Sequence, residues 1–441
     1  MTKPVTIFGD VQKNAVEQLE NVMKDDRVVA GALMADHHLG YSMPIGGVVA
    51  YRDAISPSGV GFDIACGNKC VRTEMFRDDL DVPSTMRTIQ RTVSFGLGRV
   101  NDTPTDHPLF ENELWKEPEF APLKFKARQQ LGTVGSGNHY VDLLVDDDGR
   151  LWVANHFGSR GLGHTIASGF LAIAAGKLFT DRVKESDDPA VFDIGTPAGD
   201  LYVEAMKLAG VYAYAGRDYV IDQVLNILGT TSDFGVHNHH NFAWEEEGSW
   251  VVRKGATPLT RDPAFIGGSM GDISVIVRGK MPPGSTSNTY KWDDVKYGNV
   301  DDIGALGSAP HGAGRVMSRT AAAGKLRKMW YCNNHNCDFT PERSMGNDTL
   351  YEKNRCPKCS LPLRKGRMRD TSTAAIDWHS VHSDLAKRGI YVLGSGADEA
   401  PGVYKDLTTV LSQHSNIVVM HTLEPVGVVM AGDNVHDPYA D

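Results

Sequence analysis

Five short segments of this 441-residue chain place histidine, cysteine or aspartate close to glycine. The segments are GVGFDIACG (59–67), GSGNH (135–139), NHFGSRG (155–161), VHNHHN (236–241) and HGAGR (311–315). Carboxylate, thiolate and imidazole groups together are ligands for a divalent transition metal. Glycine allows a backbone to approach a phosphate closely. The five segments therefore predict a metal site beside a phosphate site, and together they are hard to explain as parts of a packed core.

Asp63 and Cys66 lie three residues apart between two glycines, so both side chains can converge on one cation. A thiolate ligand favours manganese, iron, cobalt or zinc over magnesium. Taken alone, the segment also fits a buried cysteine beside an Asx-turn. The other segments are needed to decide between these interpretations.

The histidines supply the next candidate ligands: His139, His156, His237, His239 and His240. A lone histidine on an apolar strand is more often a hydrogen-bonded core residue than a ligand. Each of these, however, adjoins a glycine loop or a second polar residue, and residues 237–241 are five ring or amide side chains in succession. A ligating imidazole must be neutral, and its second nitrogen needs a partner, which a neighbouring Asn or Asp could provide.

His311 opens the HGAGR segment, after which we expect a helix over residues 314–330. A phosphate could bind the N–H groups at that helix start, and an imidazole placed there could attack phosphorus. The alternative is a capping loop with a structural histidine. Weaker candidate anion contacts are Arg253, Lys254 and the stretch GGSMGD (267–272). The chain lacks the G-x-x-x-x-G-K-S/T motif, so a Walker-type NTPase has no support.

Charge is distributed unevenly along the chain. The formal net charge of −10 argues against a nonspecific nucleic-acid binder. Residues 325–369, however, contain 11 Lys and Arg against 4 Asp and Glu, a local charge of +7, so the other residues together carry −17. No apolar run approaches the roughly 18 residues of a membrane span, and the N-terminus lacks a signal-peptide pattern. We therefore expect a cytoplasmic protein without a membrane segment.

Four of the six cysteines form a C-x4-C pair and a C-x2-C pair: Cys332, Cys337, Cys356 and Cys359. Without a secretion signal, such pairs indicate structural Zn²⁺ and not disulfides. His335 lies inside the first pair and could replace one cysteine. The zinc would either staple an insertion that has too little core, or hold the surrounding Lys and Arg side chains against RNA phosphates. The local positive charge favours the second role.

Hydrophobic spacing and Gly/Pro punctuation predict a mixture of helices and strands. The predicted helices span residues 11–24, 162–179, 199–228 and 403–413. The predicted strands lie within residues 27–75, 250–259, 272–279 and 416–423. Because βαβ alternation is not regular, the expected class is α+β. We expect one catalytic domain, residues 1–330 and 370–441, with a small zinc-ribbon-like module inserted at residues 331–369.

In their order along the chain, these segments resemble the RtcB family of RNA-splicing ligases. The matching motifs are MADHHLGYSMPIGG (34–47), SPSGVGFDIACG (56–67), LGTVGSGNH (131–139), HFGSRGLGH (156–164), HHNFAW (239–244), RKGAT (253–257), GGSMGDIS (267–274) and HGAGRVMSR (311–319). The resemblance implies an RtcB-like catalytic domain that joins RNA ends bearing a 3′-phosphate or 2′,3′-cyclic phosphate to 5′-hydroxyl ends. It also implies GTP and two Mn²⁺ ions as cofactors and a role in RNA repair or tRNA splicing. An activating protein is a further partner that the resemblance allows.

The resemblance also implies roles for individual residues. The residues that match the ligands of two manganese ions are Asp63, Cys66 and His139 for one, and Cys66, His156 and His240 for the other. His311 matches the nucleophile that takes up GMP as a phosphoramidate. The residues that match positions around the nucleotide are Asn138, His139, Asp142, His240, Asn241, Gly267, Gly268, Ser269, Met270, Ser274, His311, Gly312, Ala313 and Gly314.

Two departures from the family concern recognition of the base. This chain has Asp142 where the family usually has Glu, and Met430 or Ala431 where it usually has Lys. A nucleotide other than GTP therefore remains open. So do two other functions, a metal-dependent phosphoesterase acting on RNA ends and a zinc-ribbon RNA-binding protein with an inactive centre. Because every expected metal ligand and His311 are present, the sequence favours an active ligase.

Overall fold

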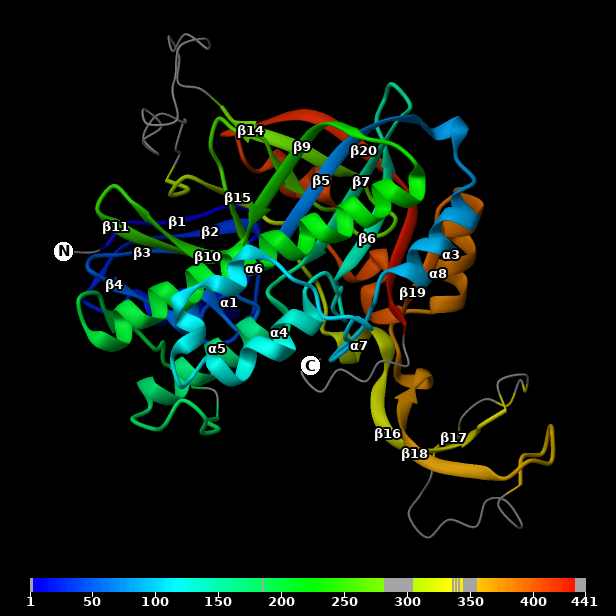
Figure 1. Ribbon diagram of the computed structural model, residues 1–441. Coiled ribbons are helices and arrows are strands. Elements are labelled where there is room, and N and C mark those ends of the chain that lie inside the picture. Colours follow the sequence, from blue (N-terminus) through cyan, green and yellow to red (C-terminus); the bar gives the residue numbers. More distant parts are fainter. Residues whose placement is uncertain are drawn as a thin grey trace.

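The structure is a computed structural model that combines two sheets, a long buried helix and a projecting three-stranded arm (Figure 1). The residues it describes are 3–184, 186–280, 304–334 and 355–432, together with 337, 339, 342 and 343. Helices and strands alternate irregularly along the chain. The predicted α+β class is confirmed.

The larger sheet has eight strands, with the order β13-β14-β20-β6-β7-β5-β9 and β19 paired to β20. Its strands are β5 (Gly67–Phe76), β6 (Tyr140–Val145), β7 (Arg150–Phe157), β9 (Ser232–His239), β13 (Ala264–Ile266), β14 (Ser274–Gly279), β19 (Tyr391–Ser395) and β20 (Ile417–Gly432). Strand β7 pairs antiparallel with both β5 and β6. Residues far apart in sequence are thus brought to one end of the sheet.

The smaller sheet has five strands in the order β1-β2-β3-β11-β10. Its strands are β1 (Val5–Ile7), β2 (Val28–His38), β3 (Ile45–Tyr51), β10 (Asn241–Glu246) and β11 (Ser249–Lys254). Two short pairs complete the body: β4 (Ala54–Ile55) with β8 (Phe192–Asp193), and β12 (Ala256–Pro258) with β15 (Ser308–Pro310). The chain leads directly from β9 through His240 into β10, which links the two sheets.

Helix α6 (Pro197–Leu228) has residue types that specify both of its ends. At its start, Thr196 accepts a hydrogen bond from the N–H of Gly199, and Pro197 occupies the first helical position. At its end, Gly229 adopts a left-handed conformation with φ of 67°. The helix packs on β5 and β7 and against α5 (Arg160–Ala174), so most of its circumference is buried (Figure 1).

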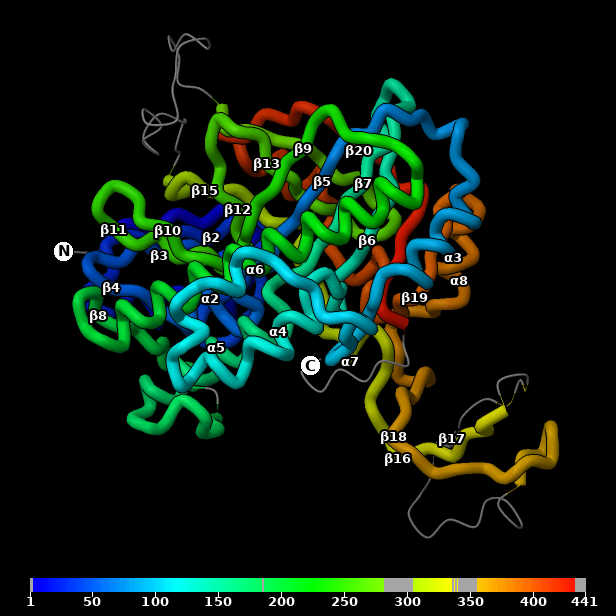
Figure 2. The backbone as a smooth tube through the Cα atoms, viewed as in Figure 1, coloured from blue at the N-terminus to red at the C-terminus, as the bar shows by residue number. Residues whose placement is uncertain are grey.

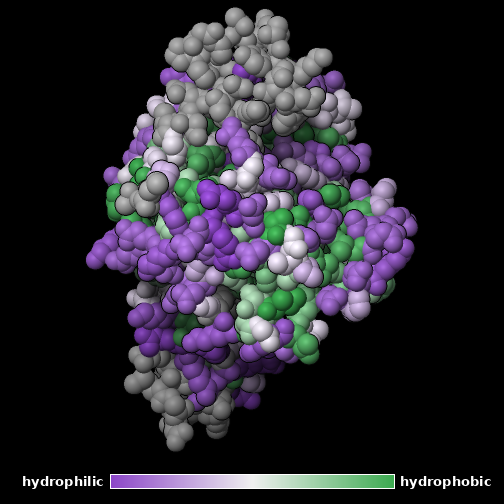
Figure 3. Space-filling model, turned by 90° about the vertical axis from the view of Figure 1, so that its left-hand side faces the viewer, coloured by the Kyte–Doolittle hydropathy of each residue, from purple (hydrophilic) through white to green (hydrophobic). Residues whose placement is uncertain are grey.

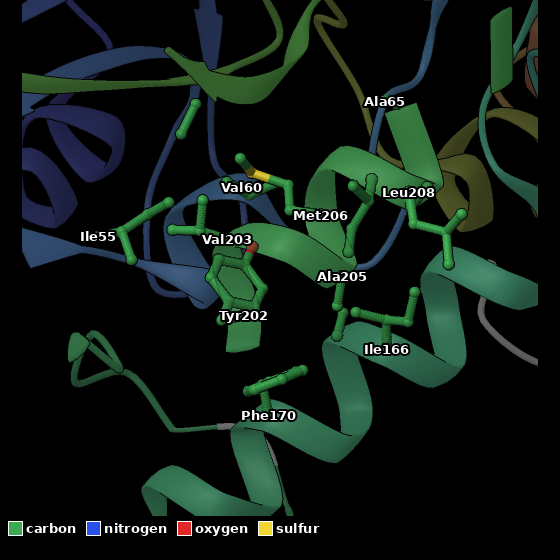
Figure 4. Close-up of a cluster of buried hydrophobic side chains, with 14 of the residues drawn as sticks. Ile55, Val60, Ala65, Ile166, Phe170, Tyr202, Val203, Ala205, Met206 and Leu208 are labelled. Atoms are coloured by element: carbon green, nitrogen blue, oxygen red, sulfur yellow. The ribbon is translucent and has the colours of Figure 1, made fainter. Parts of the chain in front are cut away.

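The largest cluster of buried apolar residues lies between α5, α6 and the small sheet. In Figure 4, Ile166 and Phe170 of α5 face Tyr202 and Ala205 of α6. The rings of Phe170 and Tyr202 meet edge-on, with centroids 5.1 Å apart. Such pairs favour one relative orientation of two helices beyond simple area burial. The cluster therefore fixes α6 relative to the strands that carry the site.

The remaining helices are short and lie around the sheets. They are α1 (Lys13–Val22), α2 (Pro57–Val60), α3 (Val82–Thr92), α4 (Lys124–Gln130), α7 (Arg319–Ala323), α8 (Trp378–Lys387) and α9 (Leu407–Ser412). Among the described helices, none has the length and apolarity needed to cross a membrane. On the face shown in Figure 3, hydrophilic side chains predominate, with smaller hydrophobic patches among them.

The predicted helices over residues 11–24, 162–179, 199–228 and 403–413 correspond to α1, α5, α6 and α9, with ends shifted by a few residues. The predicted strands correspond to β2, β3, β4, β5, β11, β12, β14 and the first half of β20. Propensity and hydrophobic period were sufficient here because these segments also pack as their patterns require.

The predicted helix over residues 314–330 is wrong. Only Arg319–Ala323 is helical, and Gly324, with φ of 92°, ends that helix. The next residues form strand β16 (Lys325–Cys332), which pairs antiparallel with β18 (Leu363–Asp370). A partner strand from later in the sequence overrides the local helical pattern.

Strand β17 (Glu342–Arg343) joins these two strands in a sheet of the order β17-β16-β18. Figures 1 and 2 both show this arm projecting from the body of the molecule. Cys332, which ends β16, and the other three paired cysteines lie at its outer end. His335, the alternative ligand in this segment, falls outside the described residues.

Candidate active site

The candidate metal ligands converge at one end of three neighbouring strands. Cys66 directly precedes β5, His139 directly precedes β6, and His156 lies on β7. Strands β5 and β6 both pair with β7 in register at His156. His240 follows β9 and donates its backbone N–H to the carbonyl of Cys66 over 2.8 Å. The sheet register therefore assembles the cluster.

The side chains of this cluster are within contact distance of one another. Sγ of Cys66 lies 3.6 Å from Nε2 of His139 and 3.4 Å from Nε2 of His156. Nε2 of His139 lies 3.0 Å from Oδ2 of Asp63. The ring of His240 stacks on that of His156, with centroids 5.0 Å apart. All are buried except Asp63, which is partly exposed.

The environment suits these groups to bind a cation. Burial lowers the pKa of His156 and His240 well below its usual value, which keeps both imidazoles neutral and able to ligate. Burial opposes ionisation of Asp63, but the neighbouring His139 outweighs it and lowers the pKa of the carboxyl to about 2. Burial, reinforced by the Asp63 carboxylate, raises the pKa of the Cys66 thiol. A divalent cation is the kind of partner that would stabilise its thiolate.

One ring nitrogen of His156 is already oriented by a neighbour. Nδ1 of His156 lies 2.7 Å from Oδ1 of Asn68, a contact that places the proton on Nδ1 and the lone pair on Nε2. Nε2 is the atom nearest Cys66. By contrast, Nδ1 of His139 and Nδ1 of His240 are buried without a hydrogen-bond partner among the described residues. The Nε2 atoms of His139 and His156, gathered beside the Cys66 thiol, fit a divalent transition-metal site.

Arg217 of α6 holds the backbone segments that carry the cluster. The side chain is fully buried, and its Nη1 donates to the carbonyls of Ala65 at 3.0 Å and Phe157 at 2.7 Å. These residues adjoin Cys66 and His156 directly. Because five guanidinium N–H groups point in fixed directions, one arginine can hold both ligand-bearing segments at once.

His237 and His239, which the sequence offered as further ligands, serve this arginine instead. Nε of Arg217 lies 3.0 Å from Nε2 of His237, and Nη2 of Arg217 lies 2.8 Å from Nδ1 of His239. Both rings also contact Tyr214. Of the three histidines in VHNHHN, the structure brings only His240 to the cluster.

His311 lies at the edge of the cluster, where its ring is 4.9 Å from that of His240, centroid to centroid. Its Nδ1 lies 2.7 Å from Oδ2 of Asp36, which is fully buried on β2. Burial would raise the pKa of Asp36, but the charge of the His311 ring lowers it. The backbone N–H groups of His311 and Gly312 donate to the same oxygen over 3.1 and 3.3 Å. Asp36 therefore holds the loop backbone and faces Nδ1 of the His311 ring.

The helix start expected at the HGAGR loop is not observed. Helix α7 begins at Arg319, eight residues after His311, and the first two N–H groups of the HGAGR loop already bind Asp36. The loop is instead held by Gly314, which has φ of 73° and lies so close to the Asp36 carbonyl that a Cβ would collide with it. Only glycine satisfies both conditions.

A cavity of about 510 Å³ adjoins the cluster, with His156 and His311 in its wall. That volume lies within the range of roughly 300–1,000 Å³ typical of small-molecule sites. The expected nucleotide contacts in its wall are Asn138, Asp142, Gly267, Gly268, Ser269, Met270, His311, Gly312, Ala313 and Gly314. Residues from four separate motifs thus surround one space.

Asp142 and Met430 give the cavity wall its chemical character on the side of β6 and β20. Burial raises the pKa of Asp142 well above its usual value, which favours the protonated form that can donate a hydrogen bond. Its Oδ1 has no hydrogen-bond partner among the described residues. Met430, one of the two residues expected in place of the family's Lys, is apolar and buried.

The other expected nucleotide contacts lie behind the wall. His139 and His240 belong to the ligand cluster. Oγ of Ser274 accepts a hydrogen bond from the N–H of Gly268 at 3.1 Å and so supports the glycine loop. Oδ1 of Asn241 accepts from the N–H of Gly255 at 2.7 Å. In this structure Ser274 and Asn241 shape the site from behind the residues that line it.

Arg253 and Lys254, suggested as anion contacts, are internal. Arg253 is fully buried in a bidentate ion pair with Glu246, at 2.5 and 3.0 Å, and also donates to Ser308 before the His311 loop. Lys254 donates to the carbonyl of Tyr41 at 2.5 Å. Their role here is to hold the loops around the cavity.

Sequence reasoning missed the partners of two arginines in the cavity wall. Arg315 donates to the hydroxyl of Tyr404 at 3.1 Å and to Glu399 at 3.4 Å, and Arg319 forms an ion pair with Glu399. Glu399 and Tyr404 lie outside every motif, so no pattern in the sequence marked them. Asp36 lies inside a quoted motif, but its contact with His311 depends on the fold.

The four cysteines of the arm also meet. Sγ of Cys332 lies 3.4 Å from Sγ of Cys359, and Sγ of Cys337 lies 3.7 Å from Sγ of Cys356. All four sulfur atoms lie within 4.8 Å of one another. Tetrahedral zinc with Zn–S bonds of about 2.3 Å requires sulfur atoms about 3.8 Å apart. The geometry therefore fits a single tetrahedral metal ion.

Comparison with known proteins identifies the family of this chain. The family model described as tRNA-splicing ligase RtcB matches residues 18–121 and 116–338. The chain belongs to this family. The RNA-splicing ligase RtcB of Escherichia coli (strain K12) is 30% identical over 351 residues, covering 71% of this chain and 80% of the relative.

Two archaeal relatives named tRNA-splicing ligase RtcB are similarly close. That of Archaeoglobus fulgidus is 31% identical over 400 residues, covering 72% of this chain and 79% of its own. That of Pyrobaculum aerophilum is 30% identical over 487 residues, covering 90% of this chain and 87% of its own. The likeness to RtcB ligases thus extends over most of the chain.

Proposed function

We propose that this RtcB-family protein is an RNA ligase that joins 3′-phosphate or 2′,3′-cyclic phosphate ends to 5′-hydroxyl ends through a nucleotide carried on His311. The observation that carries the proposal is the contact between His311 and the buried Asp36, beside both the ligand cluster and the cavity. A histidine whose Nδ1 faces a buried carboxylate presents Nε2 as a nucleophile.

Two Mn²⁺ ions are the cofactors that this donor set supports. Asp63, Cys66 and His139 would hold one, and Cys66, His156 and His240 the other. These donors suit cobalt or iron as well, and manganese is preferred because of the family resemblance. Bound cations would neutralise negative charge on phosphoryl oxygens.

The contact between His311 and Asp36 supports the first step. Its Nε2 attacks the α-phosphorus of GTP, so that an N–P bond forms while the bond to the leaving pyrophosphate breaks. Asp36 keeps the Nδ1 proton in place and stabilises the positive charge that the ring acquires. The glycine loops 267–270 and 311–314 lie in the cavity wall, where they would surround the nucleotide.

The later steps transfer the nucleotide to RNA. An oxygen of the RNA 3′-phosphate attacks the phosphorus held on His311, which forms a P–O–P anhydride and frees the histidine. The 5′-hydroxyl of the second RNA then attacks the 3′-phosphorus, and GMP leaves. A 2′,3′-cyclic phosphate must first be opened by water, which restores the 3′-phosphate.

The four-cysteine cluster is proposed to bind structural Zn²⁺, which would hold the outer end of the arm together. We also place the protein in the cytoplasm, because both clusters need reduced cysteines and all six thiols are free. An activating protein remains part of the proposal through the family alone.

Nucleotide transfer is the decisive experiment. The protein would be incubated with Mn²⁺ and each α-³²P-labelled nucleoside triphosphate, beside His311→Ala and His382→Ala, and run on a denaturing gel. His382 is an exposed histidine on α8 and serves as the control. We expect an acid-labile label from GTP in the parent protein and in His382→Ala, and none in His311→Ala.

The other results would change the proposal in defined ways. A His311-dependent label from a different triphosphate would keep the mechanism and replace GTP. That outcome would fit the apolar Met430 and the buried Asp142 in the cavity wall. An absence of label from every triphosphate, with metal bound, would contradict the ligase and favour the phosphoesterase.

A further inference from the structure

The arm presents two faces of different charge. Strands β16 and β18 pair without a break from Lys325 opposite Asp370 to Cys332 opposite Leu363. Because side chains alternate along a strand, alternate pairs point to the same side. One face carries Leu326, Lys328, Trp330, Cys332, Leu363, Lys365, Arg367 and Arg369. We call it the basic face, because these eight residues include four cations and no acid.

The centre of the basic face places like charges together. Lys328 lies directly opposite Arg367, and both are exposed. Like charges in a cross-strand pair destabilise a sheet by themselves. Next to them, Nζ of Lys365 lies 4.3 Å from the ring centroid of Trp330, a contact that holds a third positive charge at this surface. An anion on this face would relieve the repulsion.

The opposite face has a different charge balance. There, Nε of Arg327 lies 3.1 Å from Oδ2 of Asp370, so one cation is neutralised. Tyr331, Gly366 and two methionines occupy much of the remainder. Exposed Lys325 and Arg364 stand at its two ends, separated by these uncharged residues. The concentration of charge is therefore a property of one face and not of the whole arm.

The root of the arm lies near the cavity. Arg319, in the cavity wall, begins helix α7, and β16 starts two residues after that helix ends. At the root, the N–H of Lys325 donates to Oγ1 of Thr373 at 2.8 Å, and Arg369 donates to the carbonyl of Gly324 at 3.2 Å. Eight strand residues extend about 26 Å, enough to follow several nucleotides. Figure 1 shows the arm leading outward from α7.

We propose that the basic face of β16 and β18 binds backbone phosphates of the RNA substrate away from the ends that are joined. This inference rests on the proposed RNA ligase function and adds where the body of the RNA lies. Since the rest of the chain carries −17, the local positive charge of this region favours RNA on this face. Lys and Arg without base-reading partners predict binding that depends on salt and little on sequence.

A matched pair of double variants tests the proposal in the full-length protein. Lys328→Ala with Arg367→Ala removes two cations from the basic face. Lys325→Ala with Arg364→Ala removes two from the opposite face of the same strands. Binding would be measured by fluorescence anisotropy at several salt concentrations, with an RNA of about 20 nucleotides that has hydroxyl groups at both ends. Zinc content and thermal unfolding would confirm that both variants fold.

We expect the basic-face variant to bind this RNA on the order of tenfold more weakly. Its plot of log affinity against log salt should flatten by about 1.4, since each lost phosphate contact contributes about 0.7 for a single strand. The opposite-face variant should change the affinity less than about twofold. Both should keep the His311 label, because the arm lies outside the cavity wall.

Two results would overturn the inference. Equal weakening by both variants would show that only net charge matters. Unchanged affinity in the basic-face variant would exclude RNA from the face and leave an acidic protein as its partner. Failure of the proposed function would look different: the parent protein would take no label from any triphosphate, whatever the two faces do to RNA binding.

Discussion

The two cysteine-containing clusters of this protein are built in opposite ways. The buried centre collects its candidate ligands from residues 63 to 240, on segments that only the sheet register brings together. The four-cysteine cluster takes all its thiols from 28 residues, between Cys332 and Cys359 on one arm. The centre is positioned by surrounding side chains such as Asn68 and Arg217. The arm has a small apolar cluster around Trp330 instead.

The two clusters therefore differ in how far the fold alone positions their side chains. A ligand set assembled from distant strands is positioned before any cation binds, because the core fixes it. A ligand set within a short, poorly packed segment depends on the metal for its own order. Four measurements, taken from the largest expected effect on the buried centre and its surroundings to the smallest, examine this contrast.

The largest effect is expected from Asp36→Asn. Asn has nearly the same shape but cannot stabilise a positive charge on His311. We expect the rate of His311 labelling to fall by about 10²- to 10⁴-fold. Metal content and unfolding temperature should remain close to those of the parent. A rate within about threefold of the parent would show that Asp36 only holds the loop backbone.

The next effect is expected from Arg217→Met. This change leaves the carbonyls of Ala65 and Phe157 buried without their donor, so the free energy of unfolding should fall by about 3 kcal/mol or more. Urea denaturation would measure it, with the exposed Arg91→Met of α3 as a control that should change it by less than about 0.5 kcal/mol. Equal losses in both variants would contradict the supporting role of Arg217.

A smaller effect is expected when His414 becomes protonated at low pH. Its Nε2 accepts a hydrogen bond from the N–H of Ala35 at 3.0 Å, and burial lowers its pKa to about 4. The folded state therefore resists a proton that the unfolded state accepts near pH 6.5. This contribution to stability is complete above about pH 6.5 and is lost as the pH falls towards 4.

The free energy of unfolding of the parent should accordingly fall by up to about 1.4 kcal/mol per pH unit between pH 6.5 and 4 because of this residue. His414→Gln retains an acceptor but does not titrate, so its stability should change less steeply between pH 6.5 and 4. Identical slopes for the parent and the variant would assign the acid sensitivity to other groups.

The smallest effect on the buried centre is expected from Cys332→Ser with Cys359→Ser. Loss of two thiolates should remove about one equivalent of zinc, measured by elemental analysis, and disorder the outer arm. Labelling of His311 should stay within about twofold of the parent, because the centre does not depend on the arm. If labelling were abolished, the two clusters would not be independent.

Several features of this protein could be predicted from its sequence because the responsible residues are neighbours in the chain. The spacing of the four arm cysteines, the pair Asp63 and Cys66, and the ends of α6 at Thr196 and Gly229 are of this kind. Family motifs extended this reach, since they marked His139, His156, His240 and His311 together. Their convergence beside one cavity is what the structure adds.

Other features were decided by tertiary structure alone. The partner of His311 is Asp36, 275 residues away, and residues 325–332 form a strand because β18 pairs with them. His237 and His239 share one side of β9 and meet Arg217, whereas His240 lies beyond the end of that strand. The physical reason is the same in each case. Local residue types fix which contacts a segment can make, but only the packed core determines which of them are made.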